Sequence, residues 1–221
     1  MRLSWAWITI VLIAMFSLCA QAQNTASKDA QINEAKGMPP RSTPGDYQAQ
    51  APAGAVTIAA EFMGHSVPRP EGSLSTEDYV VVETGLFGPP DARIKLSLED
   101  FSLRINGKKT PLTSQPYGLV AKSLKDPEWA PPVPPESKSK TSFGGAGQGD
   151  SNSPPAPVHV PIELQRAMAQ HVQKASLPEG DRALPVAGLI FFQYRGKAQS
   201  IHSIELIYAG AAGKATLTLQ P

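Results

Sequence analysis

Short runs in which apolar and polar residues alternate are the feature that most restricts the fold of this chain. A two-residue period places successive side chains on opposite faces, so each run is typical of a strand with one buried face. Such runs occupy residues 56–62, 79–87, 92–98, 101–105, 201–208 and 215–219. In the fifth run we expect one face to carry His202, Ile204, Leu206 and Tyr208. Turn residues separate the runs, which predicts an all-β chain of antiparallel strands.

Three segments add to this pattern. Residues 188–194 (GLIFFQY) are continuously apolar, as expected for a central strand that is covered on both faces. Asn106-Gly107 predicts a hairpin turn, because a type I′ turn needs two positive φ values. Residues 161–175 show helical periodicity, with an apolar stripe that would have to dock on the rest of the protein. That stripe comprises Leu164, Met168, His171, Val172 and Ala175.

Proline and glycine divide the chain into predicted ordered and unordered parts. Residues 23–54 contain almost no large aliphatic residue and are predicted to be a disordered linker. Residues 55–221 are predicted to form a single β-sandwich domain, because the strands before residue 123 and those after residue 157 are each too few to bury two sheets. This domain would contain a Pro/Gly-rich insertion, residues 123–157, followed by the helix at 161–175. Before the insertion, we also predict a loop at 65–78 and a short strand at 117–121.

Residues 1–22 have the three-part layout of a secretory signal peptide. Arg2 is followed by an apolar core at 8–16, and Ala20-Gln21-Ala22 has the small-x-small pattern of a cleavage site. We therefore expect cleavage after Ala22 and a periplasmic or secreted protein, with no membrane span once the signal is removed.

Two other readings of the N-terminal segment remain open. It could be kept as an anchor, although its apolar run at 5–19 is shorter than the roughly 20 residues that a spanning helix needs. Cys19 could be lipidated, although Leu18 stands where lipoprotein processing requires a small residue. We favour cleavage over both.

Charge and cysteine content exclude several classes of protein. The formal net charge is +1, and it falls to 0 when residues 1–22 and their single charge, Arg2, are removed. A neutral chain lacks the basic excess that nucleic acids and anionic membrane surfaces attract. The single cysteine, Cys19, lies in the signal. A cleaved chain therefore has no disulfide, no thiol nucleophile and no cysteine-ligated metal site.

No familiar catalytic motif is present, and we expect neither a cofactor nor catalytic residues. The sequence has no Gly-x-Ser-x-Gly, no phosphate-binding Gly-x-x-x-x-Gly-Lys and no His-Glu-x-x-His. The four histidines are His65, His159, His171 and His202. A metal site built from His65, His202 and a carboxylate such as Asp78 is an open alternative, but we favour histidines that are hydrogen-bonded or solvent-facing.

Two further segments have both a functional and a structural interpretation. A basic run around the predicted hairpin could bind an acidic partner; it comprises Arg93, Lys95, Arg104, Lys108 and Lys109. Trp129 stands among prolines and could mark a polyproline II recognition segment. We favour the structural interpretations, which are a solvated strand face with lysines protecting an edge and a stiff linker.

Residues 79–83 (YVVVE), 94–106 (IKLSLEDFSLRIN), 188–192 (GLIFF) and 201–219 form a set that resembles the telokin-like, immunoglobulin-like domains of exported bacterial proteins. The resemblance covers about 100 of the 221 residues and consists mainly of core patterning. It implies an immunoglobulin-like antiparallel β-sandwich and carries over no active residues. The chain departs from that family in its longer segment at 123–185 and in lacking the cysteine of the lipoprotein form.

These observations favour an exported, non-enzymatic binding or interaction module with an unknown protein partner in the cell envelope, since such sandwiches present loops and edge strands to partners. One alternative is a metal-binding protein or hydrolase that uses the scattered histidines. Another is a structural or assembly factor of the envelope. The fold alone does not decide among them.

The signal-peptide interpretation makes a direct prediction about the exported protein. We expect its first residue to be Gln23, because cleavage follows Ala22. Intact mass or N-terminal sequencing of exported protein measures this. A mass that retains residues 1–22, or one that carries lipid on Cys19, would show that the interpretation is wrong.

Overall fold

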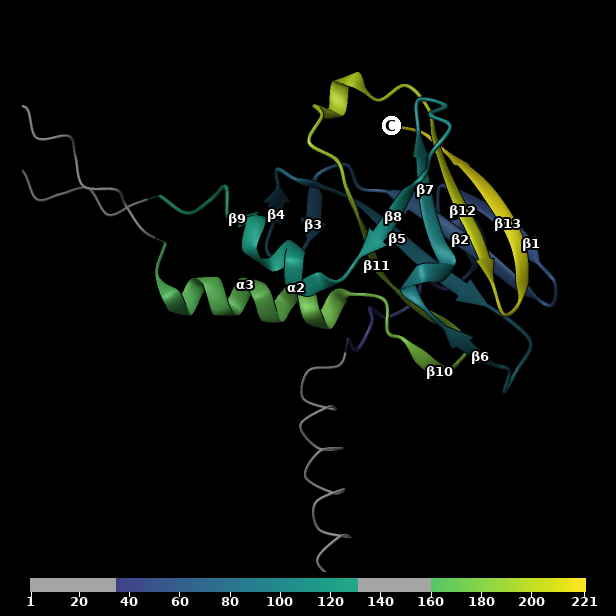
Figure 1. The fold of residues 1–221 in the computed structure, drawn as a ribbon. Helices are drawn as coiled ribbons and strands as arrows, with labels where there is room; N and C mark the ends of the chain where they lie inside the picture. The colour runs from purple at the N-terminus through teal and green to yellow at the C-terminus, as the bar shows by residue number, and fades with distance from the viewer. Residues whose placement is uncertain (1–34, 131–159) are drawn as a thin grey trace, which may run out of the picture.

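The computed structural model describes residues 35–130 and 160–221, and antiparallel strands are the predominant secondary structure of this part of the chain (Figure 1). The predicted all-β character is thus confirmed. The largest unit is one eight-stranded sheet with the order β1-β2-β5-β11-β8-β7-β12-β13. Its strands are β1 (Ala49–Ala53), β2 (Val56–Phe62), β5 (Tyr79–Phe87), β11 (Val186–Gln193), β8 (Leu112–Gln115), β7 (Phe101–Ile105), β12 (Ile204–Gly210) and β13 (Gly213–Leu219).

The sheet curves until its first and last strands come close to each other. The Gln48 side-chain amide, just before β1, donates to the Gln220 carbonyl just after β13 at 3.1 Å. At the other end of these strands, Gly54 fits beside Ala212, where a Cβ on the glycine would come within 2.4 Å of the Ala212 carbonyl oxygen. The result is a nearly closed sheet that encloses its core.

Strand β11 joins the two halves of this sheet. It pairs with β5 over its whole length, from Val186 opposite Leu86 to Gln193 opposite Tyr79. On its other edge it pairs with β8 over residues 191–192 only. Strands that precede and follow residues 131–159 therefore alternate within one sheet, and their inward side chains form one cluster. The largest of these side chains are Phe101, Phe192, Tyr208, Ile58, Leu86, Leu103, Ile190 and Ile204.

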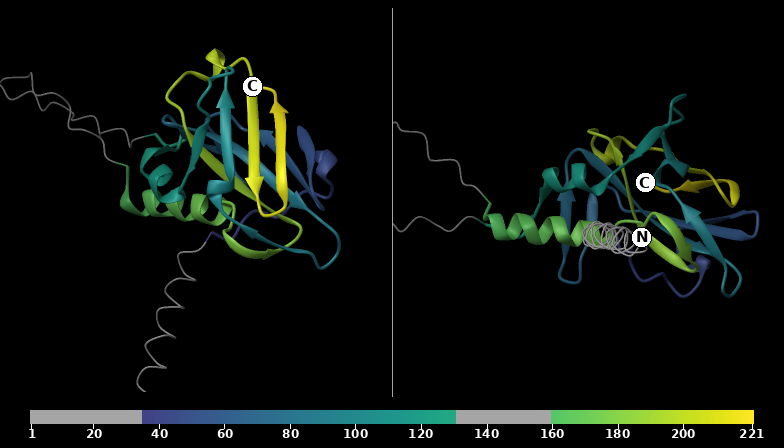
Figure 2. Two further views of the ribbon diagram at one scale, coloured as in Figure 1. Left: turned by 45° about the vertical axis from the view of Figure 1, so that its right-hand side comes forward. Right: turned by 60° about the horizontal axis from the view of Figure 1, so that its bottom comes forward.

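A second apolar cluster covers the outer face of β5 and β11. Helix α3 (Ile162–Ala175) contributes Met168, Val172 and Ala175, and β11 contributes Leu189 and Phe191. The remaining cover comes from short elements, which are β3 (Ser66–Pro68), β4 (Ser73–Thr76), β9 (Leu124–Lys125), α2 (Tyr117–Val120) and η3 (Ala121–Ser123). In both views of Figure 2, this layer lies at one side of the molecule, and β12 and β13 lie at the other.

Smaller elements complete the fold. A separate two-stranded sheet pairs β6 (Arg93–Leu96) with β10 (Gly180–Ala183). Three single-turn helices are η1 (Pro44–Asp46), η2 (Leu98–Asp100) and η4 (Ala198–Ser200). Among the residues that the structure describes, no helix combines the length and the apolar character needed to cross a bilayer.

Several local predictions are confirmed. The helix predicted at 161–175 is α3, and its apolar stripe faces the second cluster. The run predicted to be a central strand is β11, in which residues 187–192 are all buried. Asn106 and Gly107 have φ values of 53° and 65°, as the predicted type I′ turn requires. The turn is followed by a longer connection, since β8 begins only at Leu112.

The predicted linker at 23–54 is wrong for its described part. Residues 35–54 contain η1, β1 and the buried side chain of Tyr47. Arg41 holds this segment against the sheet through two hydrogen bonds to the buried Glu83 carboxylate, at 3.1 and 2.7 Å, and an ion pair with Glu61. These contacts raise the pKa of the Arg41 guanidinium. Aliphatic content did not reveal this order, because polar contacts and Tyr47 provide it; residues 23–34 lie outside the described part.

Three further predictions need correction. The loop predicted at 65–78 contains β3 and β4, which have three and four residues and are too short for alternation to mark them in the sequence. The strand predicted at 117–121 is helix α2, since Pro116 fixes its entry and the following residues turn. The predicted insertion at 123–157 begins with β9, which pairs with β4, and residues 131–157 lie outside the described part.

The position of β11 between two clusters predicts how the protein unfolds. Phe192→Ala, on the inner face, should lower the free energy of unfolding by roughly 3–5 kcal/mol, because it opens a cavity in the core that both halves share. Hydrogen exchange should then rise in β5, β7 and β12 together.

Phe191→Ala is the matched variant, since this side chain lies in the outer cluster with α3. It should increase exchange in α3 before it does so in β7 and β12. Identical hydrogen-exchange patterns in Phe191→Ala and Phe192→Ala would show that the inner and outer clusters do not unfold separately.

Candidate binding groove

A groove runs between helix α3, the turn that joins β3 to β4, and the segment before η1. Its cavity measures about 420 Å³, within the range of small-ligand sites. We call it the α3 groove; its lining comprises Gly37, Met38, Pro39, Pro68, Arg69, Pro70, His171, Lys174 and Ala175. A second cavity of about 370 Å³ adjoins it and shares Arg69, Pro70 and His171. The two cavities thus lie on either side of the Arg69-Pro70 ridge.

The N-terminal wall of the groove is attached to the start of β11. The Met38 amide donates to the Ala187 carbonyl at 2.8 Å. Gly37 has a φ of 81°, and a Cβ at this position would come within 2.6 Å of the same carbonyl oxygen. Glycine therefore allows the chain to pass this close to β11, which fixes the position of the wall.

The opposite wall is held by a cluster of charges around Arg69. Its guanidinium forms two hydrogen bonds to Asp126, at 2.9 and 3.1 Å, and a third to Glu128 at 3.2 Å. Its Nε also donates to the Glu71 carbonyl at 2.8 Å. The hydrogen bonds from Arg69 lower the pKa of the Asp126 carboxyl, and those to Asp126 raise the pKa of Arg69. The segment after β9 thereby ties down the turn between β3 and β4.

Helix α3 supplies the floor and the third side. Ala175 is buried at the base, and Lys174 is exposed at the margin. His171 Nε2 lies 2.8 Å from the Pro68 carbonyl oxygen. Because a carbonyl oxygen can only accept, this nitrogen donates and connects the helix to the end of β3.

Three prolines make the walls of the groove stiff. Pro39, Pro68 and Pro70 line it on two sides, and a pyrrolidine ring fixes φ at each position. Walls that are rigid before binding lose little conformational entropy when a ligand enters. The α3 groove is therefore an apolar depression whose walls are restrained by proline.

The histidines predicted as possible ligands are not brought together. His65 lies beneath Tyr194, with its ring nitrogens 2.7 Å from the Tyr79 carbonyl oxygen and 3.0 Å from that of Gly196. His202 is exposed, so its predicted inward orientation is wrong; its amide bonds the Asn106 side chain before β12 begins.

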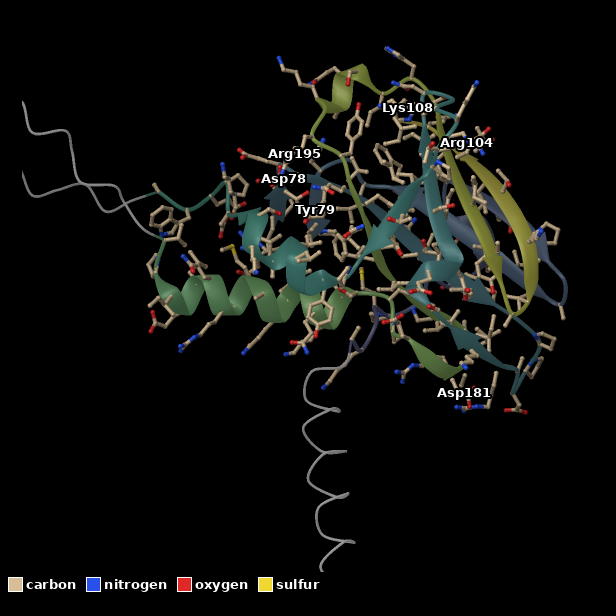
Figure 3. The ribbon with its side chains drawn as sticks, in the orientation of Figure 1. Asp78, Tyr79, Arg104, Lys108, Asp181 and Arg195 are labelled. Carbon is tan, nitrogen blue, oxygen red and sulfur yellow. The ribbon has the colours of Figure 1, made fainter. Side chains whose placement is uncertain are left out.

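His159 lies outside the described residues. Asp78 forms an ion pair with Arg195 at 2.9 Å, on the side of the sheet that carries Tyr79 (Figure 3). Within residues 35–130 and 160–221, no three histidine, cysteine, aspartate or glutamate side chains form a group that could hold a metal ion.

The predicted basic run is split between two ends of the molecule. Arg93 pairs with Asp181 at one end, and Arg104 pairs with Glu205 near Lys108 at the other (Figure 3). These cations form no common patch. Trp129 lies in a turn in which its amide donates to the Asp126 carbonyl at 3.2 Å.

Comparison of the chain with protein-family models, with curated proteins and with solved structures finds no match.

The ion pairs of Arg69 with Asp126 and Glu128 make the stability of the β3–β4 turn, which forms one wall of the groove, depend on pH. The pKa of Asp126 is lower in the folded protein than in the unfolded chain. The stabilisation is therefore complete above the unfolded value of about 3.9 and is lost as the pH falls through the folded value. We expect the amide resonances of Arg69, Glu71 and Gly72 to shift over that acid range in an NMR titration.

In Asp126→Asn we expect the turn between β3 and β4 to be loosened already at neutral pH. Asp181→Asn, which removes an exposed pair with Arg93, is the control and should leave residues 69–72 unchanged. A turn that is equally ordered in Asp126→Asn and in the native protein would show that the cluster does not hold the wall.

Proposed function

We propose that this protein is an exported, non-enzymatic binding module that holds an apolar segment of a protein partner from the cell envelope in the α3 groove. The observation that carries this proposal is a preformed apolar groove with three proline residues in its walls. Both walls are attached to the body of the protein, one by the Met38 amide and the other by Arg69. A site of this kind binds by shape and burial, with a few polar groups that set orientation.

Export, with a periplasmic or secreted location, is part of the same proposal. It is supported by the signal-peptide pattern of residues 1–22. An immunoglobulin-like sandwich is likewise proposed as the finer description of the fold. It is supported by antiparallel strands of both halves of the sheet that enclose one cluster, with loops at the ends of the strands.

The alternatives have less support. A metal-binding protein or hydrolase would need ligands in one place, whereas His65, His171 and His202 bond separate backbone groups or face solvent. A structural or assembly factor of the envelope would also present a binding surface. Filling the groove therefore tests this alternative as well.

Filling the groove tests the proposal. Pro39 is exposed in the wall, so Pro39→Trp should fill the cavity while the buried clusters stay intact. Mature protein of residues 23–221 would be immobilised and exposed to an envelope extract of the source cells, and bound proteins would be identified by mass spectrometry.

We expect the native protein to retain a partner that Pro39→Trp loses. Pro90→Trp, an equally exposed substitution outside the groove, should retain it. Identical sets of bound proteins for the native chain and Pro39→Trp would show that the groove is not the binding site.

A further inference from the structure

The charges around the groove indicate which chemistry its occupant carries. Three basic side chains, Arg69, His171 and Lys174, line it, and the lining includes no carboxylate. Arg69 is already matched by Asp126 and Glu128. Lys174 is exposed at the margin without an acidic residue in the lining to balance it. An occupant with a negative charge therefore fits this groove, and one with a positive charge is repelled.

The adjoining cavity has the opposite character. Its lining includes Glu71 and Glu128, and Lys174 does not contribute to it. Both linings include Arg69, which Asp126 and Glu128 already match, so the two cavities differ in charge through Lys174 in the groove and Glu71 in the adjoining cavity. A carboxylate that is favourable beside Lys174 would be unfavourable beside Glu71, so the position of the negative group along the groove is defined.

His171 adds a hydrogen-bond acceptor. Its Nε2 proton is used by the Pro68 carbonyl, which leaves Nδ1 as an acceptor in the neutral ring. His171 and Lys174 are three residues apart on α3 and therefore lie on one face of the helix. This face thus offers an acceptor for an N–H group and a cation for a carboxylate. A polypeptide segment carries both of these groups, whereas a fatty acid carries only the carboxylate.

From this arrangement we propose that the α3 groove binds an extended polypeptide segment in which an aspartate, a glutamate or the terminal carboxylate stands beside apolar residues. The carboxylate meets Lys174, the apolar residues contact Met38, Pro39 and Pro70, and a backbone amide donates to His171. This inference rests on the proposed function and specifies its ligand.

The test is a selection of random short peptides on the immobilised mature protein. Peptides that still bind Pro39→Trp are removed, so that only ligands of the groove remain. We expect the enriched peptides to share an acidic group next to apolar residues. Lys174→Glu should weaken their binding about tenfold or more, because it turns attraction into repulsion. Lys122→Glu, which reverses an exposed lysine outside both cavities, should leave it unchanged.

The outcomes separate this inference from the function on which it rests. Enriched peptides that lack acidic groups, or that bind Lys174→Glu as well as the native protein, would overturn the acidic ligand while the groove remains a peptide site. Displacement of the peptides by decanoate at similar concentration would overturn the choice of a polypeptide in favour of a lipid carboxylate. If no peptide is blocked by Pro39→Trp, the proposed function itself fails.

Discussion

Burial of β11 on both faces is the constraint on which the rest of the structure depends. Ile190 and Phe192 point into the enclosed core, and Leu189 and Phe191 point into the outer cluster. Burying one such side chain fully contributes about 1.5–3 kcal/mol, so neither face can remain exposed to water. The inner face requires the nearly closed sheet, and the outer face requires a second layer. Strand β11 thereby joins β5 on one edge to β8 on the other, and so links the two halves of the eight-stranded sheet.

The α3 groove follows from that second layer. Helix α3 covers the outer face with Met168, Val172 and Ala175, and its other side meets the β3–β4 turn. Strands β3, β4 and β9 pair into a small sheet, and α3 lies in the same layer without pairing with it. Prolines and fixed ion pairs, such as Arg69 with Asp126, hold the resulting gap open in one shape. Stability of the core and availability of a binding site thus have the same origin.

Local patterns predicted those parts of the fold that local physics controls. The alternating run of β12, the continuous run of β11 and the Asn106-Gly107 turn are all read from neighbouring residues. Residues 35–54 and 65–78 show no such local pattern, for the opposite reason. Their order comes from partners far along the chain, such as Glu83 for Arg41, and their own composition is poor in the large aliphatic residues that pattern analysis detects.

The sequence by itself determined the all-β class, the docking helix α3, the hairpin turn and the expectation of export. Each of these depends on the period or the composition of one continuous segment. Tertiary structure alone decided where the groove lies, because Pro68 and His171 are 103 residues apart and meet only when α3 packs on β5 and β11. It also placed far apart the histidines and the basic residues that the sequence suggested as possible clusters. Spacing along a chain fixes which face of an element a residue occupies, whereas packing fixes which other elements that face meets.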